Sequence, residues 1–230
     1  MEEKKTHHKR ILLIYFSLSS QTKNLATALM NGLQAQQIEV IEERIEPDET
    51  LRFPIGSISN TILIMLQTFF RQRVKIKPIS QHCFDHYDLI ILAGPTWSYN
   101  PSGAVLSLLD RDGGQLFKGQ TVLPLISCRG YWRMHWFGLK RLLTRLGATL
   151  FNPIIFSHPT TEPWRTIGVF LKLAGKTPEK NRFIRKFYRK YGHNRKQIKE
   201  AERFGNMIGE ALNENVDLDT LNFRNKIAIP

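Results

Sequence analysis

The chain has 230 residues, 42% of them hydrophobic, and is therefore long enough to bury one substantial core as a single α/β domain, residues 1–230. Its 33 Lys and Arg against 20 Asp and Glu give a net charge of +13, which predicts attraction to something anionic: nucleic acid, a membrane surface or an acidic protein. Two cysteines exclude a disulfide framework, no paired Cys/His spacing indicates a metal site, and no apolar run is long enough to cross a membrane.

Residues 1–9, which include the adjacent His7 and His8, are polar and are expected to form a solvated tail. No secretory signal is visible in them, so the chain is expected to be cytoplasmic. Six apolar or aromatic residues follow, Ile11–Phe16. Such a short continuous run fits a strand that is buried on both faces of a parallel sheet.

Four hydroxyl side chains crowd the next six residues: Ser17, Ser19, Ser20 and Thr22. Apolar residues then recur at helical spacing from Leu25, so the hydroxyl-rich segment is predicted to be the turn between a strand and a helix. A helix N-terminus carries unpaired N–H groups and a partial positive charge, so hydroxyls there can hold a phosphate. The alternative is that Ser20 or Thr22 only caps the helix.

A second, less buried strand is predicted at 39–45, ending before Pro47. Residues 51–79 form an apolar insertion that is closed by four cations: Arg71, Arg73, Lys75 and Lys77. Within it, the run Ile62–Leu66 is apolar almost all round a helix. This favours an ordinary core helix and leaves open a lid over an apolar substrate or an interfacial anchor.

Strands are also predicted at 86–93, 121–127 and 149–156, and the helices between them at 102–109 and 134–146. This alternation predicts a doubly wound, five-stranded parallel sheet of order 2-1-3-4-5 with helices on both faces. Turn segments with aromatic residues follow the third and fourth strands, at 94–100 and 127–131. Ligands of such sheets bind at the carboxyl ends of the strands, where these segments lie.

A basic extension is predicted at 159–193. Between Arg165 and Lys199 the chain has twelve Lys or Arg and one acid, and aromatic residues recur at helical spacing: Phe183, Phe187, Tyr188 and Tyr191. The pattern predicts an amphipathic basic helix, which is either a surface for anionic lipid, an acidic partner or nucleic acid, or a solvated face whose aromatics dock on the domain. A final helix is predicted at 195–212.

The three segments that follow strands resemble the FMN-binding loops of the flavodoxin-like family, over roughly residues 10–156 and the final helix. In that family the first loop has hydroxyl residues at its first, third and sixth positions, which Ser17, Ser19 and Thr22 match. The resemblance implies that these residues, with Ser20 and Gln21 where glycine and asparagine are common, hold the phosphate of FMN. It implies that the other two loops flank the flavin ring through Pro95, Thr96, Trp97, Tyr99 and Asn100, and through Ser127, Cys128, Arg129, Gly130 and Tyr131. No G-x-G-x-x-G follows the first strand, so FMN is expected rather than FAD or NAD.

The chain also resembles the dialkylresorcinol-condensing-enzyme-like branch of flavodoxin-fold proteins, which is associated with lipid-tailed aromatic rings. Four features carry this resemblance: the apolar Phe53-Pro54 segment, Cys128-Arg129-x-x-Trp132, Gly175-Lys176, and Ala201-x-x-Phe204-Gly205. No ketosynthase-type motif surrounds either cysteine.

Three functions remain open. The first is an FMN-dependent oxidoreductase that takes electrons from NAD(P)H and acts on a small or lipid-like quinone or aromatic ring. The second is a flavodoxin-type electron-transfer protein, which the charge of +13 disfavours because flavodoxins of that kind are strongly acidic. The third is a cofactor-less module that binds a membrane surface or an acidic carrier protein through the basic extension. Nucleic acid is disfavoured because no recognised motif accompanies the charge.

No acid, base or nucleophile is assigned from the sequence. Cys128 is either a reactive thiol or a packing residue. Arg129 either offsets negative charge on a reduced flavin or an acidic substrate, or is an ordinary surface arginine.

Overall fold

The buried run near the start of the chain is β1 (Arg10–Tyr15), which lies inside a parallel sheet in the computed structural model of residues 9–188 and 190–230. It pairs with β2 (Glu39–Arg44) on one side and with β3 (Leu89–Trp97) on the other. The tail expected for residues 1–9, with its two histidines, lies outside the described residues except for Lys9.

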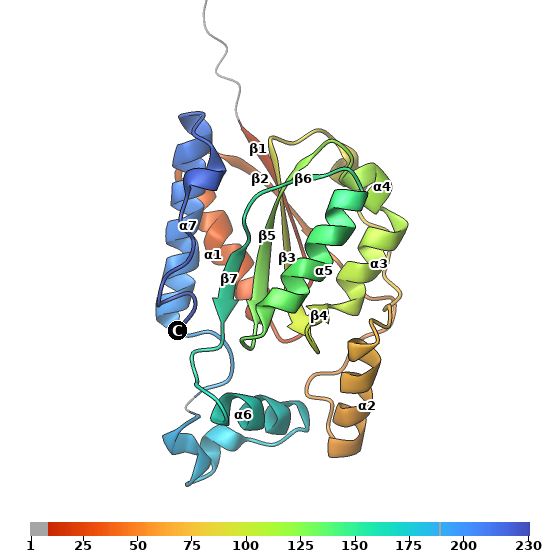
Figure 1. Cartoon of the computed structure of the whole chain (residues 1–230), viewed down its shortest axis with the longest axis vertical. Coiled ribbons are helices and arrows are strands. Elements are labelled where there is room, and N and C mark those ends of the chain that lie inside the picture. Colours follow the sequence, from red (N-terminus) through yellow and green to blue (C-terminus); the bar gives the residue numbers. More distant parts are fainter. Residues whose placement is uncertain (1–8, 189) are drawn as a thin grey trace, which may run out of the picture.

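The sheet continues from β3 to β5 (Thr121–Cys128), which pairs with β6 (Thr149–Leu150) and β7 (Ile154–Ser157), as Figure 1 shows. All these pairs are parallel, so the predicted order of five strands is confirmed. The predicted fifth strand is divided in two, and Pro153, which has no N–H to donate, lies in the gap. β4 (Asn100–Pro101) is a local antiparallel partner of the end of β3.

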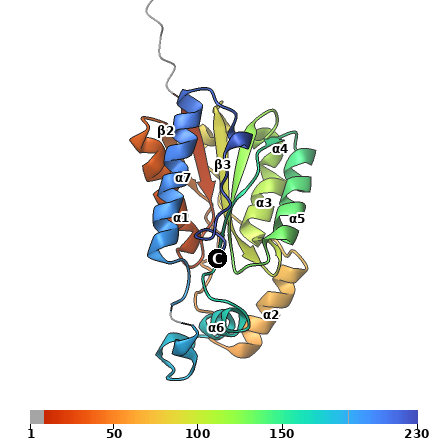
Figure 2. The same ribbon diagram turned by 60° about the vertical axis from the view of Figure 1, so that its left-hand side comes forward.

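Helices cover both faces of the sheet (Figures 1 and 2). On one face lie α1 (Gln21–Ala35) and α7 (Arg195–Asn213), and on the other α3 (Gly103–Arg111), α4 (Gly113–Leu116) and α5 (Trp132–Arg145). Side chains alternate along β1: Ile11 and Leu13 pack towards α1 and α7, whereas Leu12 and Ile14 pack towards α3 and α5. Short 3-10 segments complete the chain: η1 (Gln81–Phe84), η2 (Pro178–Lys180), η3 (Ile184–Lys186) and η4 (Leu218–Thr220).

α1 and α7 run side by side in the same direction and touch through glycines. A Cβ at Gly205 would overlap the carbonyl oxygen of Leu29, and a Cβ at Gly32 would overlap that of Glu202. Only glycine allows two helix backbones to approach this closely. Because residues 29 and 205 lie at one level, the two helices begin near each other at the carboxyl end of the sheet.

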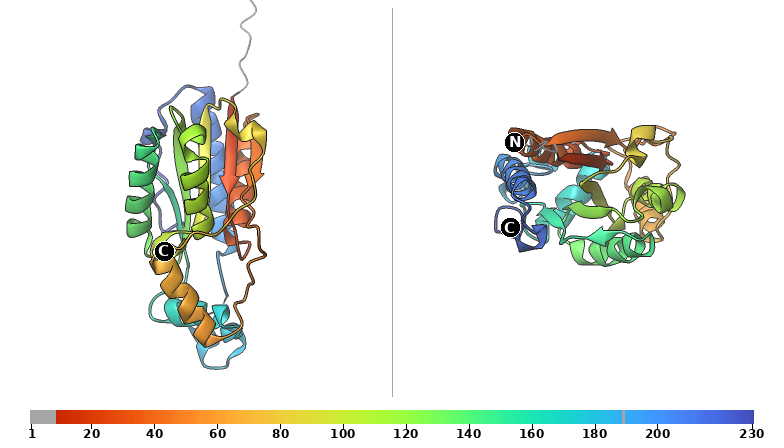
Figure 3. Two further views of the ribbon diagram at one scale, coloured as in Figure 1. Left: turned by 90° about the vertical axis from the view of Figure 1, so that its right-hand side faces the viewer. Right: turned by 90° about the horizontal axis from the view of Figure 1, so that it is seen from above.

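Two segments extend beyond the carboxyl ends of the strands, as Figures 1 and 3 show. The first carries α2 (Ile58–Phe69), and it leaves and rejoins the fold at an antiparallel bridge between Pro47 and Ile76. The second carries α6 (Trp164–Leu173), and its ends meet where the Gly192 N–H lies 3.3 Å from Nε2 of His158.

The two extending segments contact each other. The Ile55 N–H donates to the carbonyl of Leu173 at 2.7 Å, and the rings of Phe53 and Tyr191 have centroids 5.4 Å apart. The segments that carry α2 and α6 are therefore joined to each other beyond the carboxyl end of the sheet.

The favoured interpretation of residues 62–66 as part of a core helix is wrong. A helix forms there, but Thr61 is its only buried residue, and Leu63 and Leu66 are each 53% exposed. The apolar run suggested burial on several sides, but α2 lies past the end of the sheet, where the core does not reach.

The predicted basic helix over the later part of the extension is also wrong. Among the described residues of 183–188 and 190–191, only the short turn η3 is helical, and Tyr188 is fully buried while Phe183 is 71% exposed. The side chain of Asn181 accepts hydrogen bonds from the N–H groups of Phe183 and Ile184, which holds a local turn in place of a helix. Within the described residues no helix is long and apolar enough to span a bilayer.

Candidate functional site

The carboxyl ends of β1, β3 and β5 bring the three predicted loops together around a cavity of about 140 Å³, here called the small cavity. Its walls include residues 17–19, 21 and 22 after β1, residues 95–97 of β3 and residues 127–129 around the end of β5. The rest of the wall comes from the two extending segments, through Phe53 of the first, and through His158, Val169 and Leu173 (the last two in α6) and residues 191–193 of the second. The strands β1 and β3 meet where the chain order reverses, which is where open α/β sheets bind ligands.

The start of α1 has the features of an anion site. Ser20 precedes the helix in the left-handed conformation, with φ of 60°, and its side chain does not cap the helix. Ser17 is 7% exposed, and its hydroxyl lines the small cavity with no hydrogen-bond partner among the described residues. Unpaired N–H groups and a buried hydroxyl at one point favour a bound anion.

α7 begins beside α1 but is capped. The side chain of Asn194 accepts from the Gln197 N–H at 2.9 Å, and the side chain of Gln197 accepts from the Asn194 N–H at 3.1 Å. This capping box satisfies the first turn of α7. Of the two neighbouring helix ends, only that of α1 lacks a side-chain cap.

Residues 191–193 lie directly on the first loop. The Tyr191 hydroxyl donates to Oγ of Ser19 at 3.1 Å, and the His193 N–H donates to Oε1 of Gln21 at 2.9 Å. Gly192 is required between them, because its φ is +84° and a Cβ there would overlap the Gln21 side chain. The extension thus joins the first loop by two hydrogen bonds.

Two histidines in the wall of the small cavity are held neutral. Burial lowers the pKa of His158 to about 4, with help from the neighbouring His193 and Arg165. Burial likewise lowers the pKa of His193 to about 4. The Ser127 hydroxyl lies 2.8 Å from Nε2 of His193, so the third loop is tied to the start of α7.

The second loop is fixed from two directions. Oγ1 of Thr96 lies 2.7 Å from Nδ1 of His135, a residue of α5 whose pKa burial lowers to about 3. The Asn100 side-chain amide donates to the carbonyls of Thr68 and Phe69, so it holds the C-terminal end of α2.

Cys128 of the third loop is buried and lies near the positive charge of Arg165. Burial raises the pKa of its thiol to about 12, although Arg165 opposes the shift, so Cys128 is a neutral thiol at neutral pH. The Arg165 guanidinium fills the space beside Gly130, where a Cβ would lie 2.6 Å from its carbon. The Tyr131 ring meets the ring of Tyr99 edge-on, with centroids 5.2 Å apart.

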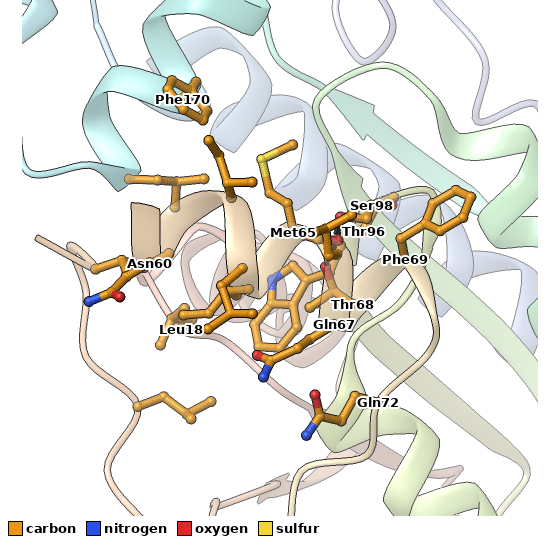
Figure 4. Close-up of a pocket in the computed structure, with 18 of the residues that line it drawn as sticks. Leu18, Asn60, Met65, Gln67, Thr68, Phe69, Gln72, Thr96, Ser98 and Phe170 are labelled. Atoms are coloured by element: carbon orange, nitrogen blue, oxygen red, sulfur yellow. Dashed lines mark hydrogen bonds between the residues drawn. The ribbon is translucent and has the colours of Figure 1, made fainter. Parts of the chain in front are cut away.

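A second cavity of about 840 Å³, here called the large cavity, adjoins the same loops (Figure 4). It lies between α2 and α6, and its lining is mostly apolar, with Met65 and Phe170 on facing helices. Trp97 and Arg129 line both cavities, so the two share a wall. The combined site has a polar end, where an uncapped helix begins, and a wide apolar chamber.

No protein-family model and no curated protein matches the chain. Among solved structures, a candidate flavoprotein from Bacteroides eggerthii is 19% identical, with a TM-score of 0.51 over 74% of this chain and 100% of that one. The fold is flavodoxin-like.

Two other similar structures have lower TM-scores. A flavoprotein in complex with FMN from Lactobacillus acidophilus has a TM-score of 0.49 and 17% identity, over 63% of this chain and 91% of that one. A flavodoxin from the domain Archaea has a TM-score of 0.49 and 14% identity, over 88% of this chain and 98% of that one.

Within this flavodoxin-like fold, the fifteen residues expected to bind a cofactor divide into three groups. Ten line the small cavity: Ser17, Ser19, Gln21, Thr22, Pro95, Thr96, Trp97, Ser127, Cys128 and Arg129. Tyr99 and Tyr131 line only the large cavity, and Ser20, Asn100 and Gly130 line neither.

Sequence reasoning missed the residues that the extension contributes. His158 comes directly after the carboxyl end of β7, and that position is the signal by which it could have been found. Tyr191 and His193 carry no such signal, because more than thirty residues, α6 among them, separate them from the end of β7.

The described residues bring together one group that could hold a metal ion: Glu43, His82 and Cys83, whose ligand atoms lie within 4.8 Å of one another. Glu43 already accepts from the Ser80 N–H at 3.1 Å, and burial raises the pKa of Cys83 to about 12. The hydrogen bond to Glu43 and the burial of Cys83 account for the closeness of these side chains, and the expectation of no metal stays a prediction.

Proposed function

We propose that this protein binds FMN, with the phosphate at the start of α1, and is an oxidoreductase for a small or lipid-like quinone or aromatic ring. The observation that carries the proposal is the buried hydroxyl of Ser17, which lacks a partner among the described residues at an uncapped helix end. A phosphate would accept from that hydroxyl and from the free N–H groups of α1. The left-handed Ser20 also gives this turn the backbone shape for which the family commonly uses glycine.

The residues at hand fit such a cofactor. Ser17 and Thr22 would hold the phosphate, and Trp97 and Tyr131 offer aromatic faces next to it. When bound, the flavin supplies hydride or single-electron chemistry. The chain supplies placement, the exclusion of water by the buried walls, and the positive charge of Arg129 for an electron-rich ring or an acidic substrate.

The substrate class is supported by the large cavity. A chamber of about 840 Å³ lined by α2 and α6 suits an apolar molecule with a ring at one end. The resemblance to the dialkylresorcinol-condensing-enzyme-like branch supports a lipid-tailed aromatic ring as that molecule. NAD(P)H is the electron donor that we propose.

A second candidate is a binding module without flavin. One observation favours it: Ser19 and Gln21 of the first loop already bond to residues 191–193. A simple electron carrier is less well supported, because the large cavity would then have no occupant.

The decisive measurement compares FMN with riboflavin, which lacks the phosphate. The double variant Ser17→Ala, Thr22→Ala should lose about a hundredfold or more in FMN affinity, because each of the two lost hydrogen bonds to a charged group costs about 1.5–3 kcal/mol. Its riboflavin affinity should stay that of the wild type. Thr144→Ala, which removes an exposed hydroxyl on α5, is the matched control.

Equal FMN affinity of the double variant and the wild type would remove the phosphate site from the proposal. Protein that takes up neither flavin would support the module without flavin. Turnover of quinones by the FMN-loaded protein with NADPH then separates an oxidoreductase from a carrier.

A further inference from the structure

α2 presents a large apolar surface to solvent. Leu63, Leu66 and Ile62, the last 49% exposed, border the large cavity and also face solvent, and Phe70, which does not line the cavity, is 78% exposed. From residue 51 to residue 81 the sequence contains no acidic residue and five cations: Arg52, Arg71, Arg73, Lys75 and Lys77. Two of them pair with acids from elsewhere in the fold, Arg73 with Asp110 and Lys77 with Glu46. An exposed, acid-free apolar helix with flanking cations is typical of a segment that lies in a membrane interface.

The surface of α2 continues onto α5. Gly138 of α5 approaches the Arg71 guanidinium so closely that a Cβ would lie 2.5 Å from Nη2. Phe137 beside it is 71% exposed, and Met134 one turn earlier is 61% exposed. With Phe70 on the other side of this contact, exposed apolar side chains extend across both helices.

The extension lies at the same end of the molecule as α2 (Figure 3), and it adds exposed aromatic side chains. Phe183 is 71% and Phe187 49% exposed, and the Phe187 ring stacks on Trp164 with centroids 4.5 Å apart. We call the exposed apolar residues of α2, α5 and the extension the apolar end.

Exposed cations flank the apolar end. Within residues 9–188 and 190–230, the ion pairs include Lys172 but none of Arg182, Arg185 and Lys186. These cations lie next to the exposed phenylalanines in the chain, so anionic and apolar groups would be bound by one surface.

We infer that the apolar end docks on the surface of a bilayer that contains anionic lipid. Duplex nucleic acid would match the charge of this surface but not the aliphatic face of α2. An acidic protein would match the charge too, but it would not explain why exposed apolar residues occur on three separate segments. A bilayer interface accommodates both kinds of side chain, because the apolar ones contact acyl chains and the cations contact anionic headgroups.

This docking does not depend on bound flavin. It has one consequence that rests on the proposed function: the large cavity lies between α2 and α6, so docking would place it against the bilayer. A lipid-tailed substrate could then enter without crossing water.

The test is flotation of the full chain with vesicles of phosphatidylcholine and a rising fraction of phosphatidylserine, at low and at high salt. We expect binding to rise with phosphatidylserine and to fall with salt, because charges on the surface are screened. The double variant Phe70→Glu, Phe137→Glu should bind about tenfold more weakly or worse. Neither residue lines the two cavities, so FMN binding by this variant separates a failure of docking from a failure of the proposed function.

Two matched controls accompany it. Val216→Glu changes an exposed apolar residue just after α7, at the opposite end of the sheet, and should bind as the wild type does. Arg182→Glu with Arg185→Glu should weaken binding about tenfold, whereas Lys118→Glu with Arg145→Glu should weaken it much less.

Three results would overturn the inference. They are no binding to anionic vesicles at low salt, equal binding by the phenylalanine variant, or duplex DNA binding that is tighter than vesicle binding and unaffected by that variant.

Discussion

Acid should destabilise this protein at a pH where most Asp and Glu side chains are still ionised, because three histidines are buried in neutral form. Burial lowers the pKa of His158 and His193 to about 4 and that of His135 to about 3, from an ordinary value of 6.5. Between pH 6.5 and 4 the unfolded chain binds protons at these sites and the folded chain does not. Folding stability is therefore fully present above about pH 7 and falls as the pH drops through this window.

The size of the loss follows from the shifts. Each histidine loses about 2 kcal/mol of stability between pH 8 and pH 5, so the three together lose about 6 kcal/mol, which is comparable with the whole stability of an ordinary domain. Carboxylates do not explain a loss in this range. Hydrogen bonds from Arg203 and Lys77 lower the pKa of Glu200 and Glu46 below 4.5, so their contributions disappear only below that pH.

Urea unfolding at several pH values between 8 and 5 measures this loss as a falling midpoint with an unchanged m-value. His135→Gln removes one of the three titrations and should reduce the pH dependence by about a third. A midpoint that is constant from pH 8 to pH 5 would refute the reasoning. So would NMR titration of the imidazoles, if all the histidines titrated near pH 6.5.

Two glycine substitutions test the packing around the site. Gly205→Ala should destabilise the fold by about 2–4 kcal/mol in urea unfolding, because its Cβ would overlap the rigid backbone of Leu29 and force α7 away from α1; an equal midpoint would show that the helices separate easily. Gly192→Ala should cost about 1–2 kcal/mol for the left-handed backbone alone, and should also break the contact with Gln21, so that proteolysis of the extension accelerates while the core stays folded. Faster cleavage after Gly175→Ala but not after Gly192→Ala would contradict this assignment of the contact.

The sheet and the loop positions could be predicted from the sequence because they depend on local patterns. The short continuous run Ile11–Phe16 fits a strand buried on both faces, and the loop that follows such a strand lies at the carboxyl edge of the sheet. The final helix, expected at 195–212, is observed at Arg195–Asn213. Its start can be recognised in the sequence because Asn194 and Gln197 have the spacing of a capping box.

The rest of the site depended on tertiary placement. The composition of α2 says that its residues are apolar, but not whether a core exists where the helix lies. The spacing of Phe183 and Phe187 resembled one face of a helix, yet the buried ring in that region is Tyr188, which stacks on His158 with centroids 5.3 Å apart and occupies the space beside Gly168. No periodicity reveals a contact between residues thirty positions apart.

The way in which the two extending segments join the fold has a consequence for how such proteins diversify. The segment with α2 begins and ends at the bridge between Pro47 and Ile76, and the segment with α6 begins and ends at the contact between His158 and Gly192. Because each pair of ends is already in contact, a segment can lengthen, shorten or be exchanged without moving any strand. The sheet is thus a constant platform, and natural variation in this architecture should concentrate in the two segments, which determine the molecule that the platform admits.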